Sequence, residues 1–406
     1  MGMRTVDEHL ADILAALPLV PPLTLALLEA RGAVLAEPVE APVPLPPFDN
    51  SAMDGYAVVA ADVAAASESD PAVLPVIGDI AAGDPGVTAL RPGLTARIMT
   101  GAPMPAGADA VIPVEWTDAG TATVRITRPA PPGHYIRRAG EDVLAGQVVV
   151  PEGTRLAAAQ LAMLAAVGRS HVLVRPRPRV VVLSTGTELR EPGSRLAHGQ
   201  IWDSNSFMLT AAAQEAGAVG YRQETVGDDP EHVRDTIEDQ LGRADAIVTS
   251  GGVSMGAHDV VKLVFTGAAE RSVVFSKVRM RPGKPQGFGL LQGTPIFTLP
   301  GNPVSAYVSF QVFVRPALRA MQGLPPEPLP TTGAVLTDDI KSPAGLRHYM
   351  RGRLSHHRGT YSVTPVEGQG SHQLQSLSSA DALIVLPEDA EAVPAGSHVE
   401  VMRMPS

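Results

Sequence analysis

The chain has no cysteine among its 406 residues, which excludes disulfides, thiolate metal ligands and cysteine nucleophiles. No apolar run approaches the roughly 20 residues that a membrane-spanning helix needs. The N-terminal sequence MGMRTVDEHLADIL lacks the apolar core of a signal peptide, and the valine at position 6 does not fit a myristoylation motif. We therefore expect a cytoplasmic protein without a membrane anchor.

Positive charge is also scarce. The 42 acidic residues outnumber the 32 lysines and arginines, and the net charge of −10 argues against a nucleic-acid-binding face, which needs clustered positive charge. Only four lysines occur, at positions 262, 277, 284 and 341, and three of them fall in one short window. Because lysine provides a compact point charge where arginine provides a planar fork, this window indicates a site with a particular geometric demand.

A chain of this length exceeds the size of a single hydrophobic core, so several domains are expected. Thr5 can cap a helix over 6–17 and Thr24 a second helix over 25–31, whereas the proline-rich segment 37–48 is typical of an extended linker. Short apolar runs broken by glycine and proline over 51–150 predict a β-rich domain, and another helix begins at Leu156.

Strands and helices alternate from Arg179 onward, which predicts a doubly wound α/β domain. Its last helix, over 302–321, has Asn302 as N-cap and Pro303 at its first position. Short strands then return. The fold class is therefore multidomain α/β plus β, with an elongated helical and linker module at 1–48 and 146–177, an inserted β-rich domain at 49–145, the α/β domain at 178–326 and a small C-terminal β domain at 327–406.

Three loops of the α/β domain follow predicted strands. They are STGTE at 184–188, SGGVSMGAHD at 250–259 and PGNPVS at 300–305. Glycine lets successive backbone N–H groups face an anion, and parallel strands bring such loops to one edge of the sheet. The pattern predicts a phosphate or oxyanion site whose binding residues are Ser250, Gly251, Gly252, Ser254, Pro300, Gly301, Asn302, Pro303 and Ser305.

The segment SKVRMRPGK adds positive charge to this region. In an extended chain Lys277, Arg279 and Arg281 point to one side, opposite two apolar residues, and Lys284 follows a turn. Such a strand can also be a charged sheet edge that resists aggregation. Beside three anion-binding loops, the ligand-binding interpretation is favoured.

Carboxylates also gather in loops, at Asp54, Asp142, Glu188, Asp228 and Asp259. Each can cap a turn or helix, and carboxylates beside phosphates also suit a magnesium site. The motif G-x-S-x-G at 252–256 matches the nucleophile elbow of α/β hydrolases, but Gly251 and Gly252 intervene between the strand and Ser254, whereas the elbow serine normally sits directly at the end of its strand. The surrounding lysines and arginines are unnecessary for ester hydrolysis.

Taken together, the motifs resemble those of the molybdopterin molybdenumtransferases, also called molybdenum insertases. The matching segments occur in the family's order along the whole chain and are FDNSAMDGYAV, RIMTGAPMPAGADAVIP, IRRAGEDV, STGTEL, SGGVSMGAHD, RPGKP, LPGNPVSA and GQGSH. The resemblance implies that adenylylated molybdopterin and molybdate react, with Mg²⁺, to give molybdenum cofactor and AMP. It also implies an elongated homodimer with the active site between the β-rich insertion of one subunit and the α/β domain of the other.

Carried over by motif, the resemblance assigns catalytic roles to Asp54, Thr100, Asp142, Glu188, Asp228 and Asp259, and ligand binding to Lys277, Arg281, Lys284, Pro300 and Pro303. Glu188, Asp228 and Asp259 would bind Mg²⁺, while the three cations, together with Arg279, would neutralise pterin phosphate or molybdate. Asp54 and Thr100 would position molybdate or the phosphoanhydride. The chain departs from the family in having Thr187 where Asp is common and Arg281 where Lys is common.

Two other functions are compatible with parts of this pattern. An enzyme that adenylylates molybdopterin would share the α/β domain but would need neither the β-rich insertion nor the C-terminal domain. A dimeric scaffold of the same fold would bind partner peptides, which no segment here favours. As an insertase, the protein would meet the molybdopterin adenylyltransferase and the apoproteins of molybdoenzymes.

Overall fold

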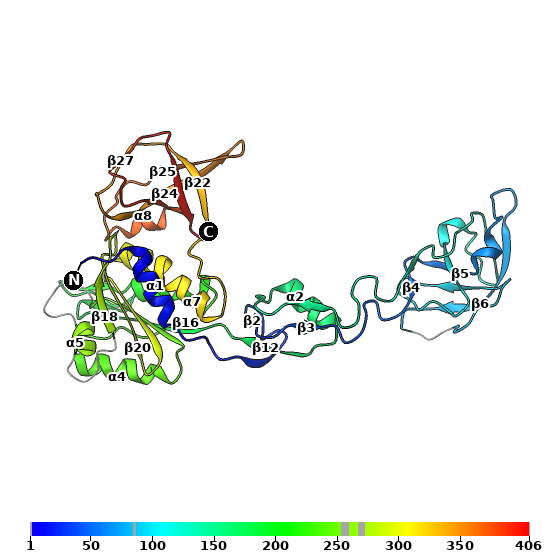
Figure 1. The fold of residues 1–406 in the computed structure, drawn as a ribbon, viewed down its shortest axis with the longest axis horizontal. Coiled ribbons are helices and arrows are strands. Elements are labelled where there is room, and N and C mark those ends of the chain that lie inside the picture. The colour runs from blue at the N-terminus through cyan, green and yellow to red at the C-terminus, as the bar shows by residue number, and fades with distance from the viewer. Residues whose placement is uncertain (1, 84–86, 253–259, 267–272, 406) are drawn as a thin grey trace. The chain divides into compact units, whose positions relative to one another are not determined.

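The computed structural model describes residues 2–83, 87–252, 260–266 and 273–405 (Figure 1). The chain forms two compact units, the first made of residues 1–25, 32–36 and 173–406 and the second of residues 26–31 and 37–172. Within the described residues, no helix is both long and apolar enough to cross a membrane. The four domain boundaries given above remain predictions.

Six strands form the sheet of the α/β domain. Their order is β16 (Val219–Arg222), β13 (Arg179–Ser184), β17 (Ala246–Ser250), β21 (Thr294–Leu299), β20 (Pro285–Leu291) and β18 (Val273–Lys277). The first four are parallel to one another, and β20 and β18 are antiparallel to their neighbours. The predicted α/β domain is confirmed, with an antiparallel pair at one edge of its sheet.

Helices cover both faces of this sheet because β13 is apolar on both sides. Val180 and Val182 pack in one buried cluster with Leu209, whereas Val181 packs in a second cluster with Val233. The helices of the domain are α3 (Asn205–Glu215), α4 (Pro230–Leu241), α5 (Val260–Thr266), α6 (Pro303–Ser309) and α7 (Arg315–Met321). This two-sided packing is what an almost continuous apolar strand requires.

The N-terminal helix α1 (Val6–Ala16) packs against the α/β domain. Thr5 and Glu8 form the capping box that the sequence predicts, with each side chain bonded to the other's backbone N–H. Ile13 is buried in the cluster that contains Phe313, and α1 contacts α7 (Figure 1).

The predicted helix over 25–31 is wrong. Residues Leu23–Ala26 form strand β1, which joins β12 (His171–Arg175) and β2 (Val34–Leu35) in a three-stranded sheet. A seven-residue helix is marginal by itself, so pairing with β12 outweighs the local preference. The linker that follows is extended as expected, with β3 (Val39–Glu40) its one short strand.

The predicted helix over 302–321 is continuous, but its hydrogen-bonding pattern changes from α to π and back to α along its length. α6 and α7 are joined by a π-helical segment, η3 (Phe310–Val314), so the backbone stays helical throughout. Pro303 occupies the first turn as predicted. Asn302 stands at the N-cap position, but its side chain makes no capping bond there; it donates to Ser371 Oγ at 3.0 Å.

The C-terminal domain is a closed barrel. Its strands are β22 (Thr331–Leu336), β24 (Arg347–His357), β25 (Thr360–Pro365), β26 (Ala382–Leu386) and β28 (His398–Arg403). The order β24-β25-β22-β28-β26 closes through the pairing of β26 with β24. Strand β19 (Met280–Arg281), which lies between β18 and β20 in sequence, pairs with β24, and helix α8 (Leu374–Ser378) lies in the same domain as β24.

The second unit contains a five-stranded sheet in the order β8 (Ala110–Pro113), β5 (Gly55–Val58), β7 (Thr95–Ile98), β6 (Ala72–Ile80) and β9 (Thr123–Ile126). These strands fall on the apolar runs that predict the β-rich domain. The other elements of the second unit are β4 (Asn50–Ser51), η1 (Ala60–Val63), η2 (Val114–Trp116), β10 (Ile136–Arg137), β11 (Val148–Val150) and α2 (Ala158–Ala166). The first unit also contains β14 (Leu189–Arg190), β15 (Ile201–Trp202), β23 (Ile340–Lys341) and β27 (Ala392–Val393).

Candidate active site

Three neighbouring parallel strands end at the same level. Ser184 at the end of β13 pairs with Ser250 at the end of β17, which in turn pairs with Leu299 at the end of β21. The three glycine-containing loops therefore begin side by side at the carboxyl edge of the sheet, as the sequence predicts. In open α/β sheets this is the edge where ligands bind.

Glycine is required at the middle loop. Gly251 has φ +97°, and a Cβ there would lie 2.7 Å from the carbonyl oxygen of Thr185. Gly252 has φ +69°, and its Cβ would lie 2.7 Å from Val261 Cγ2. Both positions combine a left-handed backbone with close packing, so the backbone itself forms this wall of the site.

A cavity of about 810 Å³ opens over these loops. It is bordered by all three loops, by the segment that precedes α3, and by two residues of the C-terminal domain. The predicted residues that line it are Glu188, Asp228, Ser250, Gly251, Gly252, Pro300, Gly301, Asn302, Pro303 and Ser305. Residues that line it and were not predicted include Ser184, Ile201, Trp202, Asp203, Asn205 and His372.

Asn205 ties two of the loops together. Its side-chain amide donates to Ser250 Oγ at 2.8 Å and to the carbonyl oxygen of Gly301 at 2.7 Å. Because the carbonyl oxygen of Gly301 can only accept a hydrogen bond, the side-chain nitrogen of Asn205, rather than its oxygen, must face it. Asn205 therefore fixes the spacing of the two loops.

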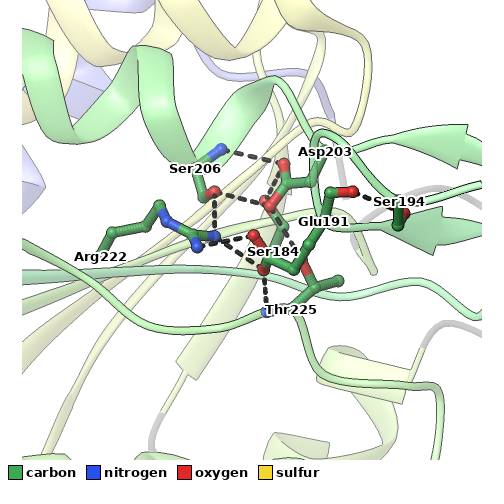
Figure 2. Close-up of polar contacts among 7 residues, drawn as sticks. All are labelled: Ser184, Glu191, Ser194, Asp203, Ser206, Arg222 and Thr225. Carbon is green, nitrogen blue, oxygen red and sulfur yellow. Dashed lines mark hydrogen bonds and ion pairs between the residues drawn. The ribbon is translucent and has the colours of Figure 1, made fainter.

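Asp203 is a buried carboxylate at the base of this wall. It is 2% exposed and accepts bonds from the hydroxyls of Ser184, Ser206 and Thr225 and from the N–H of Ser206. Figure 2 shows these side chains converging on the carboxylate, from β13, from α3 and from the loop that follows β16. A buried carboxylate with four donors is satisfied, so we assign Asp203 to holding the site together.

Two of the predicted magnesium ligands lie in this cavity. Glu188 and Asp228 both line it, and Asp228 accepts the backbone N–H of Thr187 at 2.9 Å. Thr187, at the position where the family often has Asp, therefore helps to orient the Asp228 carboxylate through its backbone N–H. Asp259 and Ser254 lie outside the described residues. Among the described residues there is no group of three His, Asp or Glu side chains placed to hold a metal ion by themselves.

A second cavity of about 510 Å³ adjoins the first, because Pro285, Ser305 and His372 border both. It lies between the RPGK turn and the C-terminal barrel. Its lining includes Arg281, Lys284, His348, Gln369, Gly370 and Ser371. Burial, followed by the nearby charges of Arg281 and Arg351, lowers the pKa of His348 to about 4, so its imidazole is neutral at pH 7.

The alternation predicted for SKVRMRPGK is confirmed. Lys277, Arg279 and Arg281 are exposed, whereas Val278 and Met280 between them are buried. Not all of these cations line the two cavities. Arg281 and Lys284 line the second cavity, while Lys277 and Arg279 line neither cavity.

The second unit brings two of the predicted catalytic residues together. Thr100 donates both its backbone N–H and its hydroxyl to Asp54 Oδ1, at 2.7 and 2.8 Å. These bonds, the backbone one foremost, hold the pKa of Asp54 below its ordinary value. Asp142 is exposed in the same unit and donates its backbone N–H to Leu45.

Most of the residues that sequence reasoning missed lie in the short segment IWDSN (201–205), which leads into α3, whereas Ser184 and His372 lie elsewhere. Asp, Ser and Asn before a helix are ordinarily read as caps. Here Asp203 does accept the N–H and the hydroxyl of Ser206, but it also accepts hydroxyls from two distant segments, those of Ser184 and Thr225. No local pattern in the sequence marks this segment, because the exposure of Ile201 and Trp202 within it is visible only in the structure.

Comparison with known families covers nearly the whole chain. Residues 4–168 match the MoeA N-terminal region (domain I and II), residues 181–320 a probable molybdopterin binding domain, and residues 333–404 the MoeA C-terminal region (domain IV). The crystal structure of a molybdopterin biosynthesis MoeA protein from Pyrococcus horikoshii superposes with a TM-score of 0.82 at 31% identity, covering 100% of both chains.

Relatives of established name are similar over the same length. Molybdopterin molybdenumtransferase 2 of Mycobacterium tuberculosis is 47% identical over 403 residues, which cover 98% of this chain and 99% of the relative. Molybdopterin molybdenumtransferase 1 of that organism is 41% identical with 98% of both chains covered, and the Bacillus subtilis protein is 34% identical with 93% and 88% covered. The chain therefore belongs to the molybdopterin molybdenumtransferase family, the enzymes that insert molybdenum in molybdenum cofactor biosynthesis.

Proposed function

We propose that the protein uses adenylylated molybdopterin and molybdate as substrates, with Mg²⁺, and releases molybdenum cofactor and AMP. Water cleaves the phosphoanhydride bond between AMP and the pterin phosphate, which releases AMP and two protons. Molybdenum binds to the pterin while one oxygen of molybdate leaves as water with those two protons. The observation that carries the proposal is the pair of adjoining cavities: one is walled by three in-register loops suited to a phosphate chain, and the other is lined by Arg281 and Lys284 and suited to an oxyanion.

Glu188 and Asp228 fit a magnesium ion bound jointly with substrate. Mg²⁺ usually takes one or two protein carboxylates and completes its shell with phosphate oxygens and water. Both carboxylates border the cavity beside the glycine loop, and Asp228 uses one oxygen for Thr187, which leaves the other available. When bound, the ion would neutralise charge on the phosphates. Asp259 is proposed as a third ligand on the resemblance alone.

Asp54 and Thr100 are proposed to act on the reacting groups from the other unit. The lowered pKa keeps Asp54 ionised at neutral pH, so this carboxylate can hold a metal ion or accept a proton but cannot act as an acid. Asp142, Lys277 and Arg279 stay in the proposed site on the resemblance and on their sequence pattern. We also propose the homodimer, with the two halves of each site supplied by different subunits, and contacts with the adenylyltransferase and with molybdoenzyme apoproteins in the cytoplasm.

The C-terminal barrel favours insertion over the alternative of pterin adenylylation. An adenylylating enzyme would not need this domain, yet its loop borders both cavities through His372 and the second cavity through Gly370 and Ser371. The loop is also bonded to α6 of the α/β domain, since Val304 donates to the carbonyl oxygen of Ser371 at 3.1 Å.

A single-turnover assay tests the proposal. Purified protein is mixed with adenylylated molybdopterin, molybdate and MgCl₂, and AMP and molybdenum-loaded pterin are quantified. We expect both products in equal amounts, and loss of both when EDTA removes the metal. Absence of molybdate-dependent AMP release would contradict the proposed reaction, and full activity in EDTA would contradict the magnesium requirement alone.

A further inference from the structure

Trp202 places an aromatic ring on the border of the first cavity. The residue lines the cavity and is 50% exposed. It is one of only two tryptophans in the chain. A ring of this size gains much by burial, so an exposed one beside a ligand cavity indicates a surface that a bound molecule covers.

The ring is fixed in one orientation. Its indole N–H donates to the carbonyl oxygen of Ser194 at 2.9 Å, which satisfies the only polar atom of the side chain. What remains exposed is therefore apolar and aromatic. A ring that is already immobilised loses little conformational entropy when a flat ligand lies on it.

The backbone on both sides of Trp202 is also held. Ile201 donates its N–H to the carbonyl oxygen of Glu188, and Asp203 donates its N–H to that of Arg190, both at 2.9 Å. Trp202 pairs with Arg190 where β14 and β15 run parallel. The next residue, Asp203, is the buried carboxylate that anchors this segment to the sheet.

The partner of the indole is anchored by a second set of polar contacts. Ser194 bonds to the carbonyl oxygen of Glu191 through its N–H at 3.1 Å and its hydroxyl at 2.6 Å. The Glu191 carboxylate is held in turn by both terminal nitrogens of Arg222, at 3.0 and 2.7 Å. Figure 2 shows Ser194 beside Glu191, and the guanidinium of Arg222 between Glu191 and the Asp203 group. The two anchors of the ring therefore belong to one network.

We propose that Trp202 is a specificity-determining residue that stacks on a planar bicyclic heterocycle of the substrate. The proposal rests on the function proposed above, in which the substrate carries such a ring at each end, a pterin and an adenine. The glycine loops would hold the phosphates that link the pterin to the adenine. Stacking on an aromatic side chain adds affinity for a base in nucleic-acid complexes, so it would select ring-bearing phosphates over simple ones.

Fluorescence tests the contact in a protein that keeps Trp202. Trp116→Phe leaves Trp202 as the only tryptophan. Neopterin monophosphate and AMP are titrated separately, with free N-acetyltryptophanamide correcting for absorption by the probes. Saturable quenching by neopterin monophosphate assigns the ring to the pterin, and quenching by AMP assigns it to adenine; either supports stacking. No saturable quenching by either probe up to millimolar concentration would overturn it.

Calorimetry on variants tests the aromatic requirement. Trp202→Leu should weaken binding of the quenching probe about tenfold, Trp202→Phe at most about threefold, and pyrophosphate should bind all three proteins equally. Ile201→Ala is the matched control, because Ile201 lines the same cavity and is 55% exposed but has no ring. Equal losses in Trp202→Leu and Ile201→Ala would contradict a stacking role. Binding is measured without turnover, so these results stand apart from the insertion assay.

Discussion

Thr100 donates two hydrogen bonds to the same oxygen of Asp54, although the residues are 46 positions apart in the sequence. The backbone N–H and the hydroxyl approach Oδ1 together, and Oδ2 receives no bond among those assigned within the described residues. The side chain is exposed, so the charge faces solvent or a ligand rather than a buried partner. This arrangement fixes both the ionisation and the orientation of a carboxylate predicted to be catalytic.

Neutralising Asp54 is expected to stop turnover without unfolding the protein. Asp54→Asn keeps the size of the side chain and removes the charge, and we expect kcat to fall about a hundredfold or more, as when a group that stabilises the transition state is lost. The single-turnover assay measures the rate, and thermal unfolding checks the fold. A variant with normal kcat would remove Asp54 from the catalytic residues.

The hydroxyl of Thr100 is expected to contribute through Asp54. Thr100→Val keeps the backbone bond and the shape but removes the hydroxyl bond, so kcat should fall about tenfold, as the loss of a bond to a charged group predicts. Thr100→Ser keeps both bonds and should stay near the wild-type rate. If Thr100 acts only through Asp54, Thr100→Val should have almost no effect in the Asp54→Asn background; additive losses would show an independent role.

Arg281 and Arg279 offer a matched pair for the oxyanion cavity. Both are exposed on the same side of one segment, but only Arg281 lines the cavity. Arg281→Ala should raise KM for molybdate about tenfold or more, and Arg279→Ala about twofold at most, because only Arg281 lines the cavity and can contact an oxyanion bound there directly. The Arg281 effect should shrink as salt rises. Equal effects of the two substitutions would mean that general surface charge, rather than the cavity, attracts molybdate.

Asn205 is expected to set phosphate affinity by spacing two loops. Asn205→Asp is nearly isosteric but cannot donate, and it places a carboxylate oxygen against the carbonyl of Gly301. We expect AMP and pyrophosphate to bind at least tenfold more weakly by calorimetry. Ser250→Ala removes only one of the two acceptors and should cost less. Unchanged binding in Asn205→Asp would show that the loops hold their spacing without the bridge.

The sequence was sufficient for features that depend on periodicity and on glycine. The alternation of Lys277, Val278 and Arg279 predicted which side chains are exposed, and three glycine loops after apolar strands predicted the edge where the cavity lies. The prediction of a helix over 25–31 was wrong because pairing of β1 with β12, far along the chain, outweighed the local helix preference. The contacts of Asp54 with Thr100 and of Asn205 with Gly301 join residues 46 and 96 positions apart, and no local pattern encodes them.

His9 should make stability depend on pH. It is 4% exposed against Phe313, and burial, then the charge of Arg4, lowers its pKa from 6.5 to about 4. In the unfolded chain the imidazole of His9 binds a proton below about pH 6.5, whereas in the folded chain it binds one only below about pH 4. The stabilisation is therefore complete above pH 6.5 and is lost as the pH falls, by about 2 kcal/mol at pH 5. His9→Phe should remove this part of the slope in urea unfolding followed between pH 7 and 5, and His398→Phe, at an exposed position, should not.

Mixing inactive subunits tests where the two halves of the site come from. Asp54→Asn and Asp228→Ala inactivate different halves, in different compact units of the chain. If each site combines halves from two subunits of a homodimer, a heterodimer of the variants holds one intact site and one doubly damaged site. Random exchange of equal amounts then restores about a quarter of the wild-type activity, since half of the dimers are mixed and half of their sites are intact. If both halves come from one chain, every site keeps one lesion and mixing restores no activity.

Co-expression of the two variants with different affinity tags, followed by isolation of the doubly tagged dimer, should raise the activity to about half of the wild-type value. This experiment separates subunit exchange from catalysis.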